Sequence, residues 1–142
     1  MLSLCMFCIG IVLVLDQGLK TYARTHWKGK SIKRKFFTLS FVKNEGAFRG
    51  LLKGKPLVLK GIHISACLFI FILLMASLFL KKNRKLSLGL AFLLAGGVGN
   101  LYDRLKHGYV TDFIALKPSG NLYYNVADFS VFFGAIWSLF HS

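Results

Sequence analysis

The sequence predicts an all-α membrane protein, with four transmembrane helices in a single integral membrane domain over residues 1–142 and a small β-like extracytoplasmic segment in the first connection. Composition is the first reason. Of the 142 residues, 55% are hydrophobic and only 17% are charged, whereas about a quarter of the residues of a soluble domain are charged. Run length is the second reason. The apolar residues fall in long runs, and a spanning helix needs about 20 of them.

Four runs qualify as spans, and they differ in the charges they carry. The first holds Asp16 and Lys20 near its end, the third holds no charge, and Asp128 is the single charge of the fourth. Because lipid offers the backbone no hydrogen-bond partners, a helix is expected for each run. The expected spans are about residues 1–22, 57–80, 86–102 and 122–140.

The connections between the spans are unequal in length. In the first, about residues 23–56, the stretch FTLSFV at 37–42 places bulky apolar residues at alternate positions. That period of two predicts a short strand on the membrane surface. The second connection, residues 81–85, is so short that the spans on either side form an antiparallel hairpin. The third, about residues 103–121, contains two Asp residues and Pro118.

The charge balance is strongly positive, with 19 Lys and Arg against 5 Asp and Glu. The distribution argues against a nucleic-acid partner, because nearly all the basic residues lie between the hydrophobic runs, where they can meet anionic lipid head groups. Orientation from charge alone is ambiguous. Four of the five residues 81–85 are basic, but the first connection, on the opposite face, holds more basic residues in total. We give more weight to the density of basic residues than to their total number, and we therefore expect the second connection in the cytoplasm.

Cysteine and histidine give no sign of a metal or an organic cofactor, and none is expected. Cys5 and Cys8 have C-x-x-C spacing, but no second pair completes a zinc site. We interpret all three cysteines as small apolar helix residues. The four histidines, at positions 26, 63, 107 and 141, are scattered.

All five acidic residues are expected at one membrane face. Spans that alternate in direction bring the end of the first and third and the start of the second and fourth to the same side. Ionisable residues in or near spans are costly, and that cost makes them functional candidates. This side is expected to hold Asp16, Asp103, Asp112 and Asp128, together with Asn44 and Glu45.

Two neighbouring carboxylates suit hydrolysis, because they share a proton, so that one can act as a general base on water while the other polarises a carbonyl. The residues alone leave the choice of pair open. Asp16 and Lys20, four apart, can form a structural ion pair. Asp103 can pair with its neighbour Arg104, and Asp112 can be a solvated loop residue. A polar residue inside a span can also join helices.

Five motifs in order resemble the lipoprotein signal peptidase (type II signal peptidase) family, over about residues 14–136. They are VLDQGLK at 14–20, NEGAF at 44–48, GGVGNLYDR at 96–104, GYVTDF at 108–113 and YNVAD at 124–128. Two departures stand out. The second motif has one small residue fewer than usual before its aromatic, which leaves the register of the 36–50 loop open, and Tyr124 replaces the usual Phe.

The resemblance implies a membrane aspartic endopeptidase with four spans and both termini in the cytoplasm. It implies an active site towards the extracytoplasmic face of the bacterial inner membrane. The substrate would be a diacylglyceryl-modified prolipoprotein, cleaved just before its lipidated cysteine. Carried over by motif, the catalytic aspartates are Asp112 and Asp128. The matching substrate-binding or supporting residues are Asn44, Gly46, Asn100, Asp103, Arg104, Asn125, Asp16 and Lys20. We expect a monomer in contact with membrane lipids.

Spacing agrees with these roles. Asn125 lies three residues before Asp128, and Asn100 three before Asp103, so helices would place each pair on one face. Gly96, Gly97 and Gly99 would let the third span pack closely against a neighbour.

Two other functions are possible from the residues alone. A small four-span proton-coupled transporter would use a membrane carboxylate, but such a group belongs near the midplane, whereas these aspartates lie near one surface. A lipid-binding membrane protein without enzymatic activity would explain the basic connections but not the gathered carboxylates.

Overall fold

The computed structural model describes residues 1–47, 51–80, 83–117 and 122–142. Its elements, in chain order, are α1 (Leu2–His26), β1 (Ser31–Lys33), β2 (Phe37–Asn44), α2 (Pro56–Phe79), α3 (Arg84–His107), β3 (Val110–Leu116) and α4 (Val126–Phe140). Three sequence features lie wholly or partly outside the described residues: the end of the 36–50 loop, the first two lysines of the 81–85 connection, and Pro118.

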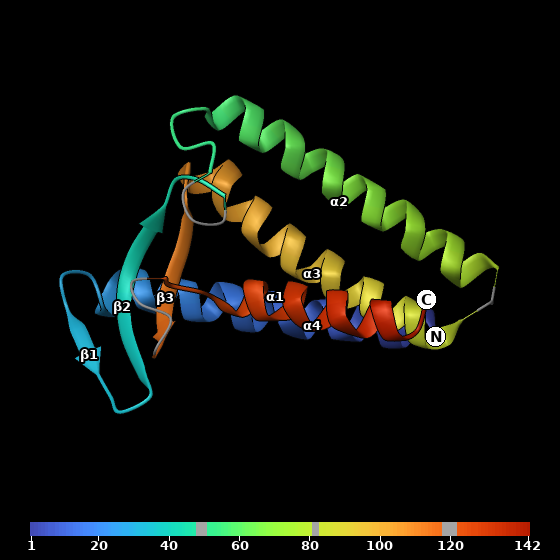
Figure 1. Cartoon of the computed structure of the whole chain (residues 1–142), viewed down its shortest axis with the longest axis horizontal. Helices are drawn as coiled ribbons and strands as arrows, with labels where there is room; N and C mark the ends of the chain where they lie inside the picture. Colours follow the sequence, from blue (N-terminus) through green and yellow to red (C-terminus); the bar gives the residue numbers. More distant parts are fainter. Residues whose placement is uncertain (48–50, 81–82, 118–121) are drawn as a thin grey trace.

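The expectation of a mainly helical membrane protein is confirmed. Among the described residues, α1, α2 and α3 are long and apolar enough to cross a membrane, and α4 is a shorter apolar helix of 15 residues. The helices alternate in direction, so both chain termini lie at one end of the molecule and the strands lie at the other (Figure 1). Three helices therefore meet the length of a span, and the fourth span stays a prediction.

Helix α3 is central, because it packs against each of the other three helices. Glycine makes the contact with α4 close. A Cβ added at Gly96 would meet the backbone at the start of α4, and one at Gly134 would meet the backbone of Leu93 on α3. The close packing expected for the glycines of the third span is thus present. The buried apolar cluster between α1, α2 and α3 includes Cys5 and Cys67, which supports the interpretation of these cysteines as apolar helix residues.

Helix boundaries differ from the expected spans mainly at the end that carries the strands. Helix α1 continues to His26, a full turn beyond the expected 22, and α3 continues to His107. Asp103 and Arg104 therefore lie on a helix rather than in a connection. Gly108, with φ of 81°, ends α3 in the left-handed conformation, which costs glycine little. Helix α4 starts later than the expected 122, because Tyr124 still forms a β-bridge with Ile114.

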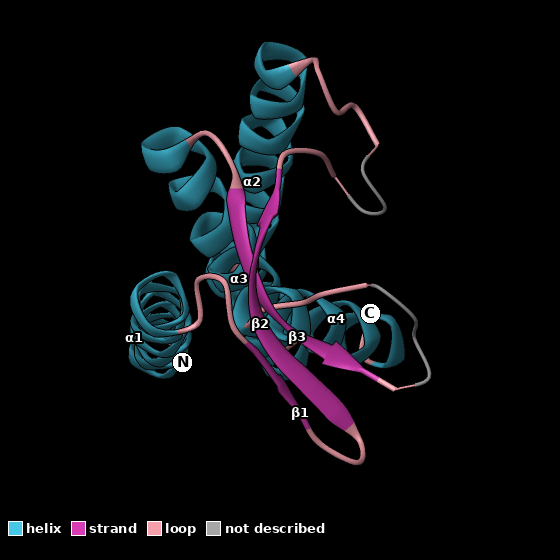
Figure 2. Cartoon of the chain, turned by 90° about the vertical axis from the view of Figure 1, so that its left-hand side faces the viewer, coloured by secondary structure: helices cyan, strands magenta, loops and turns pink. Residues whose placement is uncertain are grey.

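The strands form one antiparallel sheet in the order β1-β2-β3 (Figure 2). Strand β2 confirms the strand expected within the first connection. Strand β3 was not expected, and it comes from the third connection. The β2–β3 register runs from Phe37 opposite Leu116 to Asn44 opposite Val110, with an irregularity between Leu39 and Val42. This pairing fixes the third connection across the ends of the helices.

Candidate active site

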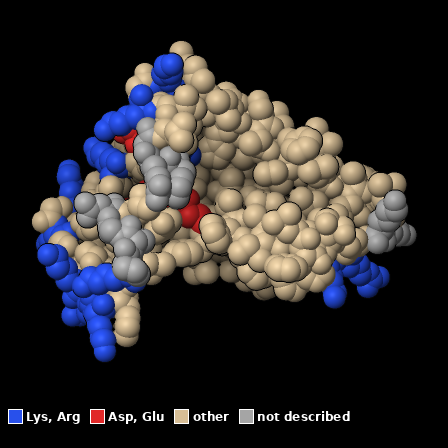
Figure 3. All heavy atoms as spheres, in the orientation of Figure 1, with Lys and Arg blue, Asp and Glu red and all other residues tan. Residues whose placement is uncertain are grey.

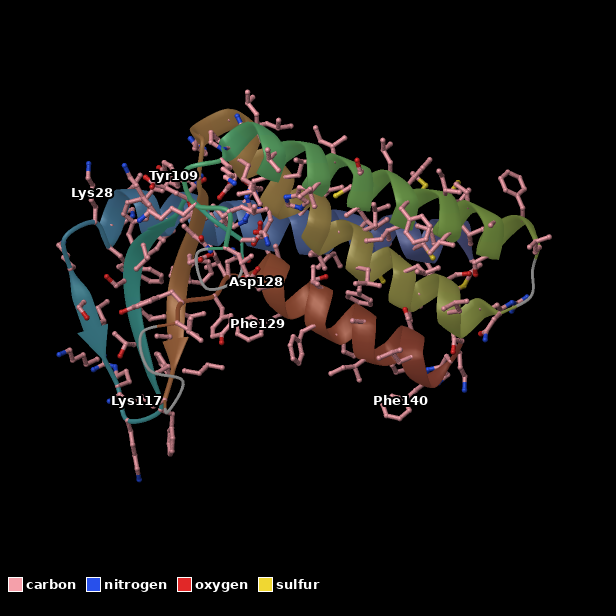
Figure 4. The ribbon with its side chains drawn as sticks, turned by 45° about the horizontal axis from the view of Figure 1, so that its top comes forward. Lys28, Tyr109, Lys117, Asp128, Phe129 and Phe140 are labelled. Atoms are coloured by element: carbon pink, nitrogen blue, oxygen red, sulfur yellow. The ribbon has the colours of Figure 1, made fainter. Side chains whose placement is uncertain are left out.

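A cavity of about 1250 Å³ lies between the sheet and the ends of α2, α3 and α4. Its polar lining includes Asn44, Asn100, Arg104, Asp112 and Asp128, and its remaining walls are largely apolar. Figure 3 shows acidic atoms between the strongly basic sheet end and the helical body, which on this face shows charged atoms only at its far end. Figure 4 shows Asp128 at the end of α4 nearest the sheet, with Phe129 beside it and Phe140 at the far end.

Asp112 and Asp128 are brought together by different elements, strand β3 and the first turn of α4. Each of their four carboxylate oxygens accepts a hydrogen bond from an uncharged donor. Asn125 and Asn44 donate their side-chain amides to the two oxygens of Asp112, at 2.8 and 3.1 Å. Asn100 donates to one oxygen of Asp128 at 2.8 Å, and the backbone N–H of Asn125 donates to the other at 3.0 Å. Among the described residues, neither carboxylate has a Lys or Arg nitrogen within 4 Å.

Asn125 is the residue that joins the two carboxylates. It is fully buried and is the N-cap of α4, where its side chain and that of Asp128 form a reciprocal capping box. Its amide nitrogen also lies 3.0 Å from Asn100 Oδ1 and 3.2 Å from the carbonyl oxygen of Thr111. One side chain therefore fixes the start of α4, strand β3 and helix α3 relative to one another.

The pKa of Asp112, on β3, is raised to about 7. Burial is the largest cause, and the charge of Asp128 adds to it. The hydrogen bonds from Asn44 and Asn125 and the charge of Lys20 act in the opposite direction, because they favour the ionised form. At neutral pH the Asp112 carboxyl therefore exists in both protonation states.

A cluster of buried charges lies behind this pair. Lys20 contacts Asp16 at 2.7 Å and Asp103 at 3.6 Å, and all three side chains are completely buried. Arg24 lies 3.6 Å from the second oxygen of Asp103. Lys20 also donates to Asn100 Oδ1 at 2.9 Å. The amide of Asn100 is thereby oriented with its nitrogen towards the carboxylate pair.

The buried charged side chains also bind the backbone of α4 and β3, the two elements that carry Asp128 and Asp112. Asp16 accepts a hydrogen bond of 2.8 Å from the backbone N–H of Ala127, at the start of α4. Asp103 accepts one of 2.9 Å from the backbone N–H of Thr111, on β3. The ion pair expected of Asp16 with Lys20 is confirmed. The alternative pairing of Asp103 with its neighbour Arg104 is wrong, because the cations that reach Asp103 come from α1.

Arg104 and Gly46 instead connect α3 to the end of β2. Arg104 Nη2 donates to the carbonyl oxygen of Gly46 at 2.8 Å, and the N–H of Gly46 donates to Asn44 Oδ1 at 3.1 Å. Asn44 in turn contacts Asp112.

The interpretation of Asp112 as a solvated loop residue is wrong, because Asp112 lies on strand β3 and has 3% of its surface exposed.

Sequence reasoning missed Arg24, Thr111 and His63. A signal for Arg24 was present, because it follows Asp16 and Lys20 at intervals of four and so continues one helical face. Thr111 contributes backbone groups and accepts a hydrogen bond from Arg24 at 2.9 Å, and His63 lies against Arg104. Nothing in the local sequence distinguishes these two. Among the described residues, no group of three His, Cys, Asp or Glu side chains is arranged to hold a metal ion.

Comparison with known proteins gives a consistent result. The family model described as signal peptidase (SPase) II matches residues 8–142. A lipoprotein signal peptidase of Moorella thermoacetica is 38% identical over 138 residues, which cover 91% of this chain and 87% of the relative. One from Syntrophus aciditrophicus is 33% identical over 145 residues, covering 96% and 89%.

The fold agrees with the sequence comparison. A bacterial membrane enzyme solved by the in meso method at 2.3 Å resolution superposes with a TM-score of 0.82 at 27% identity, covering 97% of this chain and 86% of that one. With its helices of spanning length and a family match along nearly its whole sequence, the chain belongs to the signal peptidase II family, a family of membrane peptidases.

Proposed function

We propose that the chain is an aspartic endopeptidase that removes the signal peptide from diacylglyceryl-modified prolipoproteins, cutting before the lipidated cysteine, with Asp112 and Asp128 as the catalytic pair. One observation carries the choice of pair. Of the four aspartates at this end, Asp112 and Asp128 line the cavity, and every hydrogen bond that they accept from the described residues comes from an amide. Asp16 and Asp103 instead form buried ion pairs with Lys20 and Arg24.

The proposed chemistry uses one proton shared between the two carboxyls. The ionised member takes a proton from water as the water oxygen attacks the scissile carbonyl carbon, and the protonated member donates its proton to the carbonyl oxygen. When the tetrahedral intermediate collapses, the C–N bond breaks, the leaving nitrogen takes the proton that came from water, and a hydroxyl of the intermediate returns a proton to the other carboxylate. A pKa of about 7 for Asp112 supports this cycle, because a protonated carboxyl remains available at neutral pH.

The rest of the site fits an extended, lipid-bearing substrate. The apolar wall of the cavity includes Ile62 on α2 and Phe129 and Phe132 on α4, which offer contact to acyl chains. The carboxylates lie beside this wall, at the end of the helices. We propose that α4 and the residues just before it complete a fourth span. We further propose a monomer in the bacterial inner membrane with the sheet on its extracytoplasmic face.

The deciding experiment is cleavage of a purified lipidated prolipoprotein by wild type, Asp112→Asn and Asp128→Asn in detergent. The expected result is cleavage by wild type and loss of at least about 1000-fold in either variant, as when one member of a catalytic unit is removed. Glu45→Gln is the matched control, because Glu45 is an exposed carboxylate that makes none of the hydrogen bonds of the pair. Full activity in either Asp variant would refute the assignment, and equal cleavage of the unlipidated precursor would refute the substrate class.

A further inference from the structure

A line of four hydrogen bonds leads from helix α2 to the carboxylate of Asp112. Arg104 Nη1 lies 3.0 Å from His63 Nδ1, and Arg104 Nη2 donates to the carbonyl oxygen of Gly46. The N–H of Gly46 donates to Asn44 Oδ1, and Asn44 Nδ2 donates to Asp112 Oδ2. The hydrogen bond from the Gly46 N–H to Asn44 Oδ1 therefore orients the Asn44 side chain so that its Nδ2 faces Asp112.

His63 begins this line, and its chemical state follows from its partner. A guanidinium has only donors, so Nδ1 of His63 must accept the hydrogen bond, and the ring is neutral with its hydrogen on Nε2. The ring also lies close to the backbone of Gly97 on α3. The contact with Arg104 defines the tautomer of the ring.

Arg104 depends on that acceptor. Arg104 has 9% of its surface exposed, and its Nε has no hydrogen-bond partner among the described residues. The described hydrogen bonds of the guanidinium are those to Gly46 and His63. Removing His63 as an acceptor would leave Nη1 buried without a partner, a cost of the kind that makes a side chain reorient. Any reorientation of Arg104 would weaken or break its hydrogen bond to the carbonyl oxygen of Gly46.

We propose that His63 is a positioning residue for the catalytic pair: by accepting a hydrogen bond from Arg104 it holds Gly46 and Asn44 in register, and so keeps the Asn44 amide on Asp112. This inference rests on the proposed function for its kinetic readout. It has a second readout, the ionisation of Asp112, which does not need cleavage.

The ionisation readout follows from the direction of the last hydrogen bond. Asn44 donates to the ionised carboxylate, and such a bond favours the charged form. When the Asn44 amide is no longer held on Asp112, the pKa of Asp112 moves further above about 7. Among the described residues, the charged groups that face Asp112 are Asp128 on α4, Lys20 on α1 and Arg104 on α3. A substitution at His63 replaces none of these charges, and of the three only Arg104 contacts His63.

The experiment compares His63→Leu with His63→Asn, which keeps an acceptor near the position of Nδ1. For His63→Leu, kcat/KM should fall about fivefold, the worth of one hydrogen bond, and the alkaline limb of its pH profile should move to higher pH. His63→Asn should recover most of both. Infrared titration of the protonated carboxyl band, assigned with Asp112→Asn, should show the same upward shift without any substrate.

Two controls make the outcome specific. His26→Leu changes another histidine, which is exposed at the sheet end and whose described hydrogen bonds stay within its own helix, and it should alter neither readout. The double variant of His63→Leu with Arg104→Lys should be no slower than Arg104→Lys alone, because both act through one guanidinium.

The proposal is overturned if His63→Leu leaves the infrared titration of Asp112 unchanged, or if the His63 and Arg104 effects multiply. Failure of wild type to cleave, or full activity of Asp112→Asn, would instead refute the proposed function, and the infrared titration would still decide the role of His63. If His63→Leu does not fold, His63→Phe, which also lacks an acceptor, takes its place in the infrared titration and in the double variant with Arg104→Lys.

Discussion

Asn125→Ala is the substitution expected to affect both the stability and the chemistry of the site. Asn125 Oδ1 accepts a hydrogen bond of 2.9 Å from the N–H of Asp128, which caps α4. Its Nδ2 donates to Asp112 Oδ1 at 2.8 Å. Alanine removes both groups at a position with no exposed surface, so water cannot replace either of them easily.

The expected loss of stability is the sum of two contributions, one from the N-cap of α4 and one from the Asp112 oxygen that loses its donor. An N-cap contributes about 1 kcal/mol to helix stability. A buried acceptor left without its donor costs about 1–3 kcal/mol, and Asp112 Oδ1 has no other described donor. The free energy of unfolding should therefore fall by about 2–4 kcal/mol. The pKa of Asp112 should also rise further above about 7, since the lost bond stabilised the ionised form.

The assay is denaturant unfolding in mixed detergent micelles, together with a pH profile of cleavage. Asn125→Ser is the matched control, because serine is a good N-cap but is too short to replace the amide that contacts Asp112. The serine variant should recover about 1 kcal/mol of stability while its pH profile stays shifted like that of alanine. If serine restored the pH profile, or if alanine cost less than a cap alone, the bridging role of Asn125 would be refuted.

Three further predictions use other parts of the fold. The first concerns Asp112→Asn. In the wild type, burial raises the pKa of Asp112 from 3.8 to about 7 in the folded state. The stability that this carboxyl contributes is therefore full below pH 3.8 and is lost as the pH rises through about 7. The difference in unfolding free energy should shift in favour of the variant by about 4 kcal/mol between low pH and pH above 7, and a constant difference would contradict the burial of Asp112. Gly96→Leu should displace α4 and abolish activity, because a Cβ there would meet the backbone of that helix, whereas Gly10→Leu, with nothing within 4 Å, should remain active in the same cleavage assay. Lys20→Met should cost about 3–5 kcal/mol in unfolding experiments, since it leaves the buried Asp16 carboxylate without its cation, and adding Asp16→Asn should recover part of the loss.

Local patterns in the sequence predicted the helices and part of the sheet. The apolar runs correspond to α1, α2 and α3 with ends shifted by one to five residues, the largest shift being at the end of α3. The alternation at 37–42 predicted β2. Strand β3 could not be recognised this way, because most of its residues are buried on both faces, so it has no alternating pattern. Its partner is also distant in the chain, and pairing with β2 depends on the whole fold.

The sequence by itself determined that the chain enters the membrane as apolar helices and that four aspartates gather at one end, because hydropathy and alternating direction are properties of the chain itself. Its motifs indicated Asp112 and Asp128, but its residues did not separate them from Asp16 and Asp103. Only the tertiary structure separates the two pairs. It brings Lys20 and Arg24 of α1 against one pair and asparagine amides against the other. The distinction is tertiary because a carboxyl's proton affinity depends on the charges and donors packed around it.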